Sequence, residues 1–361
     1  MKILTICQEI KEGGFYDRYL SLIEAMLEQG WEVHYLSAAE FPIKHPNLRF
    51  HKTSPIRGIN APLFARFMPS AVLRGMYLAR KQAFDRIVVF GSAYGFIGWA
   101  LKKTFGIPLV TFLRADLLEN LRIQGRQKLV KPTSVMQKFA FGASDKIIVN
   151  ISAVGDKVRS RYNIPEKKVS LIHNDIPPEF RKPAKVRRGR DIGFVGVLEK
   201  RKGIDTLLKA YQKVHGELGR RLVIVGSGPM RKDIEEFVKS HGLSGKVVLA
   251  GWKPRTEIKR LMSSFSLLVA PSLSEGCPNT VLEALGCGTP CIGSDIPEIR
   301  EILGHDELLF APGNSYDTGK RILEAFRKYD TVKSVCLERK ERFVFDWKQA
   351  CIEAIENIRA R

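Results

Sequence analysis

The fold of this chain is indicated most clearly by the stretch Ser274-Glu275-Gly276-Cys277-Pro278-Asn279-Thr280-Val281-Leu282-Glu283-Ala284. Residues 265–270 (FSLLVA) precede it as a short apolar run typical of a buried strand, and from residue 279 to residue 285 the spacing is helical. The stretch is therefore predicted to join a strand to a helix. In open α/β sheets, ligands bind at such junctions.

Two glutamates flank this junction, Glu275 and Glu283. A helix that starts near Pro278 would direct its first amides towards a ligand and favour an anion such as phosphate. Two helical turns give about 10–12 Å of rise at about 1.5 Å per residue, enough for one carboxylate to reach a sugar and the other a ribose. The alternative is a solvated loop glutamate and a helix-surface glutamate.

Strand-like and helix-like segments alternate through the rest of the chain. After residues 2–7, Gly13 and Gly14 open a loop before an amphipathic helix at 15–28. Further apolar runs are at 86–90, 108–112, 146–150, 169–173 and, in a second set, 191–195. This alternation predicts doubly wound parallel sheets. The basic, proline-rich residues 177–190 between the two sets suggest a linker, which gives domains at 1–183 and 184–342.

Length and composition agree with two globular domains. The chain has 361 residues, of which 44% are hydrophobic, and no apolar run approaches the roughly 18–20 residues that span a bilayer. The first seven residues are too short for a signal-peptide core, so a cytoplasmic protein is expected. The six cysteines show no C-x-x-C spacing, which argues against a metal knuckle or a disulfide framework and favours small core residues.

The charge is strongly positive and uneven. The chain has 59 basic and 38 acidic residues, a net charge of +21, and residues 1–185 hold 29 of the basic and 15 of the acidic ones. Basic and apolar side chains alternate between Arg57 and Arg86, in what is predicted to be a helix pair interrupted by Pro69. Peripheral contact with an anionic membrane is one interpretation, and core-facing helices with a solvated basic face are the other. No motif supports nucleic-acid binding.

Further motifs recur beyond the first stretch, at 193–196 (GFVG), 200–203 (KRKG), 223–229 (VIVGSGP), 248–252 (VLAGW), 288–290 (GTP) and 294–298 (SDIPE). In order and spacing, they and the two glutamates resemble the Glu-x7-Glu family of retaining, nucleotide-sugar-dependent glycosyltransferases, known as group 1 or family 4. The resemblance implies the GT-B fold, in which two Rossmann-like α/β domains face each other across a cleft. It also implies that residues 343–361 return to the N-terminal domain as a helix, with Trp347 as a packing anchor.

The resemblance also implies roles for the charged residues of the C-terminal half. Lys202 matches the lysine that clamps the donor diphosphate, whereas Val197 stands where these enzymes commonly have an arginine, so Arg201 is expected to supply that charge. Cations stabilise the charge that grows on the leaving diphosphate. By the same resemblance, Glu275 binds the donor sugar and Glu283 the ribose. A solvated basic loop is the alternative for residues 200–202.

Other donor contacts are expected from backbone groups and small residues. They are the amides of Gly276, Cys277 and Asn279, the neighbouring Thr280, Gly196 and Gly228, and the segment at Trp252 beside the nucleobase. The glycine turn at Gly13 and Gly14 would approach the donor phosphate or the acceptor. The run 226–228 (GSG) is also part of a dinucleotide-binding pattern, but Arg231 stands in place of the third glycine and Lys246 in place of an acid. A dehydrogenase is therefore disfavoured.

The family's histidine near the reacting sugar is missing. The corresponding turn has the sequence Leu113-Arg114-Ala115-Asp116. Asp116, assigned to the catalytic group, or Arg114 would take over sugar contacts, or else the turn is structural.

Together these features predict retaining transfer of a sugar from a nucleoside diphosphate, most simply UDP, to a hydroxyl of a glycan or lipid-linked saccharide at the inner face of the cytoplasmic membrane. The sequence has no Asp-x-Asp pair, so neither metal nor cofactor is expected. The alternative is a membrane-associated scaffold of the same fold that has lost its chemistry.

Overall fold

The computed structural model describes residues 1–7, 14–54, 63–123 and 125–358. The chain forms two compact units: unit 1 is Met1–His173 with Asp346–Arg361, and unit 2 is Asn174–Phe345. The chain therefore leaves unit 1, builds unit 2, and returns to unit 1 for its last helix. The domain boundaries predicted at residues 183 and 342 both fall inside unit 2.

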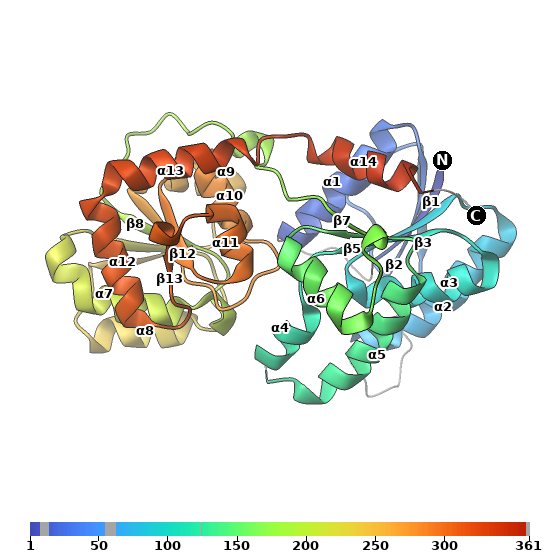
Figure 1. Ribbon diagram of the computed structural model, residues 1–361, viewed down its shortest axis with the longest axis horizontal. Helices are drawn as coiled ribbons and strands as arrows, with labels where there is room; N and C mark the ends of the chain where they lie inside the picture. Colours follow the sequence, from blue (N-terminus) through green and yellow to red (C-terminus); the bar gives the residue numbers. More distant parts are fainter. Residues whose placement is uncertain (8–13, 55–62, 124, 359–361) are drawn as a thin grey trace. The chain divides into compact units, whose positions relative to one another are not determined.

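Unit 1 contains a seven-stranded parallel sheet with the strand order β3-β2-β1-β4-β5-β6-β7 (Figure 1). The strands are β1 (Lys2–Ile6), β2 (Glu32–Ser37), β3 (Leu48–Lys52), β4 (Arg86–Phe90), β5 (Leu109–Leu113), β6 (Lys146–Val149) and β7 (Val169–Leu171). The order runs outward in both directions from β1 and β4, so the predicted doubly wound sheet is confirmed.

Helices connect these strands and cover the sheet. They are α1 (Gly14–Glu28), α2 (Leu63–Lys81), α3 (Gly95–Phe105), α4 (Leu117–Ile123), α5 (Gln127–Ala143), α6 (Ser152–Tyr162) and, from the end of the chain, α14 (Trp347–Glu356). α14 packs on α1, where Lys348 donates to Glu28 at 2.8 Å. Trp347, the first residue of α14, is only 2% exposed, as expected of a packing anchor.

The predicted break at Pro69 is wrong, because Pro69 lies inside the single helix α2. A proline inside a helix removes one backbone hydrogen bond and crowds the preceding turn. Here its ring is exposed, whereas Phe67 and Ala71 on either side are fully buried. Core packing on both sides of the proline thus keeps the helix continuous.

Unit 2 contains a six-stranded parallel sheet with the order β10-β9-β8-β11-β12-β13. The strands are β8 (Ile192–Val195), β9 (Leu222–Val225), β10 (Val247–Gly251), β11 (Leu267–Ala270), β12 (Cys291–Ser294) and β13 (Leu309–Phe310). The helices are α7 (Ile204–Leu218), α8 (Arg231–Ser240), α9 (Arg255–Ser264), α10 (Asn279–Gly286), α11 (Pro297–Leu303), α12 (Ser315–Arg327) and α13 (Tyr329–Glu341).

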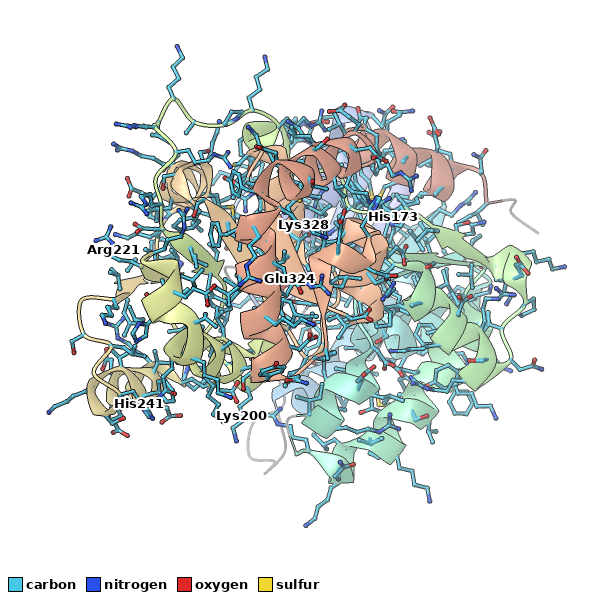
Figure 2. The ribbon with its side chains drawn as sticks, turned by 60° about the vertical axis from the view of Figure 1, so that its left-hand side comes forward. His173, Lys200, Arg221, His241, Glu324 and Lys328 are labelled. Carbon is cyan, nitrogen blue, oxygen red and sulfur yellow. The ribbon has the colours of Figure 1, made fainter. Side chains whose placement is uncertain are left out.

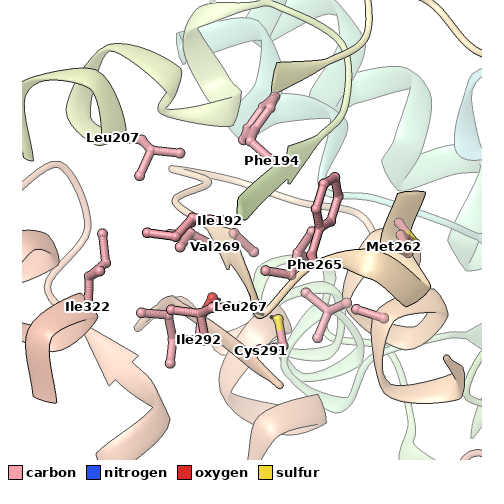
Figure 3. Packing of buried hydrophobic residues seen from close by; sticks show 14 of the residues in the cluster. Ile192, Phe194, Leu207, Met262, Phe265, Leu267, Val269, Cys291, Ile292 and Ile322 are labelled. Atoms are coloured by element: carbon pink, nitrogen blue, oxygen red, sulfur yellow. Dashed lines mark hydrogen bonds between the residues drawn. The ribbon is translucent and has the colours of Figure 1, made fainter. Parts of the chain in front are cut away.

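The core of unit 2 lies between this sheet and its helices (Figure 3). Phe265, just before β11, fills the space beside Gly193 of β8, where an added Cβ would lie 2.1 Å from the ring. Ile176 and Phe180 are also fully buried in this core. The start of the expected linker at 177–190 is therefore a packed part of unit 2.

The cysteines lie mostly in the cores, as predicted. All six are free thiols, and each is buried except Cys277, which is partly exposed. None of the helices in the described parts of the chain has the length and hydropathy of a bilayer-spanning helix.

Candidate active site

The order of strands in unit 2 reverses between β8 and β11. The chain proceeds from β8 outward to β9 and β10, and then returns to place β11 on the other side of β8. The loops after β8 and β11 therefore leave the same edge of the sheet side by side, which is where α/β proteins bind ligands. Residues 196–203 form one of these loops and residues 271–278 the other.

Close backbone contacts hold these two loops together. The Leu273 amide donates to the Arg201 carbonyl at 2.7 Å. Gly203 has a left-handed φ of 63°, and a Cβ there would lie 2.0 Å from the Pro271 carbonyl oxygen. Only glycine allows this approach, so the KRKG sequence fixes the basic loop against the glutamate loop.

Glu275 is the centre of a buried charge cluster, being only 5% exposed. Lys202 Nζ lies 2.5 Å from its Oε1, and Arg201 Nη1 lies 3.2 Å from its Oε2. The Ser272 hydroxyl donates to Oε1 at 2.7 Å. Arg201 also pairs through Nε with Glu199 at 2.7 Å. Lys202 and Arg201 lie 73 and 74 positions before Glu275 in the sequence, and the structure brings these three predicted site residues into contact.

The charge on Glu275 depends on these neighbours. Burial by itself would raise the pKa of the carboxyl group, but the charges of Lys202 and Arg201, with hydrogen bonds from Lys202 and Ser272, outweigh it and lower the pKa below its ordinary value. Glu275 is therefore ionised at neutral pH, and it holds both cations in place.

Glu283 lies on α10 and is 7% exposed. Arg255, the first residue of α9, places Nη1 3.3 Å from its Oε1. The same guanidinium donates to Glu179 through Nε at 3.0 Å and Nη2 at 2.7 Å. Arg255 also lies over the Phe180 ring, 5.0 Å from its centroid. Arg255 therefore orients Glu283 from outside the two predicted loops.

The helix after the glutamate loop begins at Asn279, with Pro278 at the capping position. Our estimate of the distance between the glutamates counted all the intervening residues as helical, which is wrong because residues 275–278 form a loop. The Asn279 side chain accepts a hydrogen bond from Asn174 at 2.7 Å. Gly276, Cys277 and Thr280 are partly exposed beside it, and their contacts with a donor stay predictions.

Gly228 has a packing role that the sequence pattern did not reveal. A Cβ at Gly228 would lie 2.5 Å from the Leu198 carbonyl oxygen, and one at Gly226 only 1.9 Å from that of Gly196. The glycines thus let the loop after β9 touch the loop after β8. By contrast, a Cβ at Gly196 would make only ordinary contacts, the nearest at 3.5 Å to Phe194.

Trp252 follows β10 at the same edge of the sheet and is 60% exposed. Lys200, in the loop of residues 196–203, is also exposed and points into solvent (Figure 2). Trp252 is thus accessible to a ligand, and the nucleobase contact assigned to its segment stays a prediction.

The unit 1 candidates belong to a separate body. Gly13 lies outside the described residues, and Gly14 is the first residue of α1. Asp116 is 8% exposed and receives both terminal nitrogens of Arg161, at 3.1 and 3.0 Å. It also accepts the amide of Leu118 at the start of α4 at 3.1 Å. Burial would raise the pKa of Asp116, but Arg161 outweighs it and the pKa is lowered.

These contacts support the structural alternative for the 113–116 turn, since Asp116 caps a helix and completes an ion pair. A catalytic role for Asp116 stays a prediction. Arg114 is 8% exposed and lies over two aromatic rings, 5.2 Å from the centroid of Phe90 and 6.0 Å from that of Trp347.

Sequence reasoning missed Arg255, Ser272, Glu199 and Arg161. Arg255 and Arg161 are far in sequence from the residues that they contact, so no local pattern could reveal them. Ser272 and Glu199 lie within the two loops, where they could have been found. Within the described residues, no group of three or more histidine, cysteine or acidic side chains could hold a metal ion.

The two sheets with their switch points define a protein with two Rossmann-like α/β units, and unit 2 carries a buried acid–base cluster at its switch point. A family model for group 1 glycosyl transferases matches residues 175–338, and a model for glycosyltransferase family 4 matches residues 16–180. The chain belongs to this group of glycosyltransferases, which have the GT-B fold.

Individual relatives agree with this assignment. An uncharacterized glycosyltransferase of Methanocaldococcus jannaschii is 28% identical over 327 residues, which cover 85% of this chain and 83% of the relative. Sucrose-phosphate synthase from Thermosynechococcus elongatus has a similar fold, with a TM-score of 0.81, 20% identity, and coverage of 98% of this chain and 96% of that one. HepE of Anabaena, solved with UDP-glucose, has a TM-score of 0.78, 17% identity, and coverage of 99% and 98%.

Proposed function

We propose that this glycosyltransferase moves a sugar from a UDP-sugar, with retention of anomeric configuration, to a hydroxyl group of a glycan or lipid-linked saccharide. The observation that carries the proposal is the contact of Lys202 and Arg201 with buried Glu275 at the switch point of unit 2. Such a cluster offers a carboxylate for sugar hydroxyls and two cations for phosphate at one place.

Lys202 and Arg201 would act on the diphosphate. As the bond between sugar and phosphate breaks, negative charge grows on the leaving oxygen, and fixed cations in a partly buried site stabilise that charge. Lys202 is already held within 2.5 Å of Glu275, so little reorganisation is required of it. Glu275 would accept hydrogen bonds from the donor sugar while it keeps both cations oriented.

The space beside Gly196 supports the same assignment. Neither the backbone nor the packing at 196 requires glycine, since an added Cβ would make only ordinary contacts, with Lys202 Cδ the third nearest atom at 4.0 Å. A side chain there would therefore fill space next to the lysine. We assign this space to the donor phosphates, with amides of the Gly276 to Thr280 segment on their other side.

Glu283 would accept the ribose hydroxyls, and Trp252 would lie beside the base. Arg255 acts on Glu283 as a positioning residue, because its guanidinium contacts the carboxylate and is itself fixed by Glu179. UDP is the favoured nucleotide because HepE, a protein of the same fold, has been solved with UDP-glucose.

Donor binding and turnover test the proposal. UDP should raise the melting temperature of the protein with or without magnesium, by mass action on the folded state. Glu283→Ala should remove most of this shift, and Lys202→Ala should lower turnover by roughly 100-fold. Lys200→Ala is the matched control, because it removes a neighbouring exposed lysine of the same loop and should keep wild-type turnover.

Donor hydrolysis without acceptor separates an enzyme from a scaffold. Slow release of UDP from a UDP-sugar by the wild type, lost in Lys202→Ala, would support catalysis. UDP binding without hydrolysis or transfer to any saccharide hydroxyl would favour the scaffold alternative, and a thermal shift with NAD alone would contradict the donor assignment.

A further inference from the structure

One face of unit 1 is formed by helices that carry basic residues and no acidic ones. α3 packs against both α2 and α5, so the three helices form one layer (Figure 1). Their sequences contain nine lysines and arginines and no aspartate or glutamate, although the whole chain has 38 acidic residues in 361. A layer of this size would ordinarily include several carboxylates. We call it the α2–α3–α5 face.

Most cations of this face have no acidic partner among the side chains that the structure describes. The exposed lysines of α3 and α5 that form no ion pair within the described chain are Lys103, Lys128, Lys131 and Lys138. Lys102 differs, because it pairs with Asp145 at 2.5 Å. The face is therefore positively charged towards solvent, not internally balanced.

Apolar side chains are exposed on the same side of α5. Leu129 is 38% exposed, Val135 51% and Phe139 46%. Lys131, Val135 and Phe139 follow one another at four-residue intervals, so they lie on one face of the helix together with Lys138. Gln137 lies nearly half a turn around the helix from Val135 and is buried against the unit.

Aromatic rings join α5 to α3. Phe96 and Trp99 of α3 have ring centroids 4.8 Å apart, and Trp99 lies 5.3 Å from Phe139. The three rings form a partly exposed apolar strip that joins the two helices.

α2 shows the same combination of exposed apolar and basic side chains. Leu73 is 69% exposed and Tyr77 51%. The Arg74 guanidinium lies 5.2 Å from the Tyr77 ring centroid, and Lys81 Nζ lies 5.9 Å from it.

We propose that the α2–α3–α5 face docks the protein on an anionic lipid bilayer. Lysines and arginines at a membrane surface pair with lipid phosphates, and exposed apolar and aromatic side chains enter the headgroup region. The sequence predicted such contact only for residues 57–86, part of which lies outside the described residues. The tertiary structure adds α3 and α5, and the surface shares no residue with the donor site of unit 2.

Binding of the full chain to vesicles tests this surface. The protein should sediment with vesicles of phosphatidylcholine and phosphatidylglycerol at low salt, but not with phosphatidylcholine alone, and binding should fall steeply as salt screens the charges. The double variant Lys131→Glu with Lys138→Glu should lower the partition coefficient by about tenfold or more. Val135→Ser with Phe139→Ser should lower it several-fold even at low salt.

A matched control has the same change of charge on unit 2. Lys213→Glu with Lys239→Glu alters exposed lysines of α7 and α8 and should keep vesicle binding within about threefold of wild type, through the small change in net charge alone. Equal losses in the two charge variants would overturn the proposal, because they would show non-specific attraction.

Two further results would also overturn it: no sedimentation of the wild type with anionic vesicles, or binding by this face to nucleic acid or another protein in place of lipid. The thermal shift with UDP should be unchanged in all these variants. Failure of vesicle binding is therefore distinguishable from failure of the proposed function.

Discussion

At Glu275, one carboxylate holds the two cations that the site would offer to a ligand. Replacement by glutamine removes the charge but keeps the shape. It leaves Lys202 without its anionic partner and Arg201 with Glu199 alone. Removing one partner of a buried ion pair is strongly destabilising. We expect Glu275→Gln to lower the free energy of unfolding of unit 2 by about 2–4 kcal/mol at pH 7, measured by urea denaturation.

Added anion and pH check the cause of that loss. Pyrophosphate or UDP should narrow the difference between variant and wild type, since either supplies the missing charge. The pKa of Glu275 is lowered in the folded state, so its stabilisation is fully present above its ordinary pKa and is lost as pH falls through the lowered value. A difference that stays constant down to pH 3 and ignores pyrophosphate would contradict this account.

Gly226 and Gly228 set the distance between the loop after β9 and the loop after β8 in unit 2. Gly226 has a φ of 140°, and an added Cβ would lie 1.9 Å from the Gly196 carbonyl oxygen, a backbone atom that cannot rotate away. We expect Gly226→Ala to destabilise the protein by about 2–4 kcal/mol and to weaken UDP binding, measured by thermal unfolding with and without UDP.

The control substitution is expected to raise the stability of the protein. Gly216 lies in α7 with no neighbouring atom within 4 Å of an added Cβ. Gly216→Ala should therefore stabilise the protein by about 0.5–1 kcal/mol through helix propensity. If both variants melt alike, the contact between the loops is not what requires glycine at 226.

A histidine pair links β2 and β3. His34 Nε2 lies 3.0 Å from a Glu32 carboxylate oxygen, so that nitrogen carries the proton. His34 Nδ1 then accepts from His51 Nε2 at 2.8 Å and from Gln82 at 2.9 Å. This network fits two neutral imidazoles, and protonating Nδ1 would replace an acceptor with a donor.

The pair should make unit 1 sensitive to acid. Burial, with the charges of His34 and Arg74, lowers the pKa of His51 to about 4, and burial also lowers that of His34. The unfolded chain therefore binds more protons between pH 6.5 and about 4, and stability falls as pH falls through this window.

We expect His51→Gln, which keeps the donor, to reduce this loss by about 1 kcal/mol, measured as unfolding free energy from pH 7 to 4. His241→Gln, an exposed site on unit 2 (Figure 2), should leave the pH profile unchanged. An unchanged slope in His51→Gln would show that other groups cause the acid sensitivity.

The whole molecule consists of one contiguous unit and one discontinuous unit. Unit 2 is a single stretch with its own core, whereas unit 1 needs α14 from the end of the chain. α14 contributes four buried side chains, Trp347, Cys351, Ile352 and Ile355. We expect residues 174–345 alone to fold cooperatively and to bind UDP, measured by calorimetry.

A chain truncated after residue 345 is the companion experiment. It should keep the unit 2 transition but lose several kcal/mol of unit 1 stability, because the surface that α14 covers becomes exposed. If neither fragment shows a cooperative unfolding transition, then neither unit is stable without the other.

Most of the fold and part of the site followed from the sequence alone. Apolar periodicity located the strands, since the side chains of a buried parallel strand are apolar on both faces. The Glu-x7-Glu spacing and the glycine-containing motifs marked the loops of unit 2, because turns and helix starts depend on a few neighbouring residues. The contacts that require glycine at 203, 226 and 228 are made with other loops, and the sequence did not predict them. The net positive charge also followed from the sequence, because it depends only on the composition.

The tertiary structure decided what depends on residues far apart in sequence. It placed Lys202 and Arg201 on Glu275, Arg255 on Glu283 and Arg161 on Asp116. It also kept α2 continuous through Pro69 and put α3 beside α5. The physical reason is that local patterns record conformation and burial, whereas partners of buried charges and neighbours of helices are set by how the sheet orders its strands.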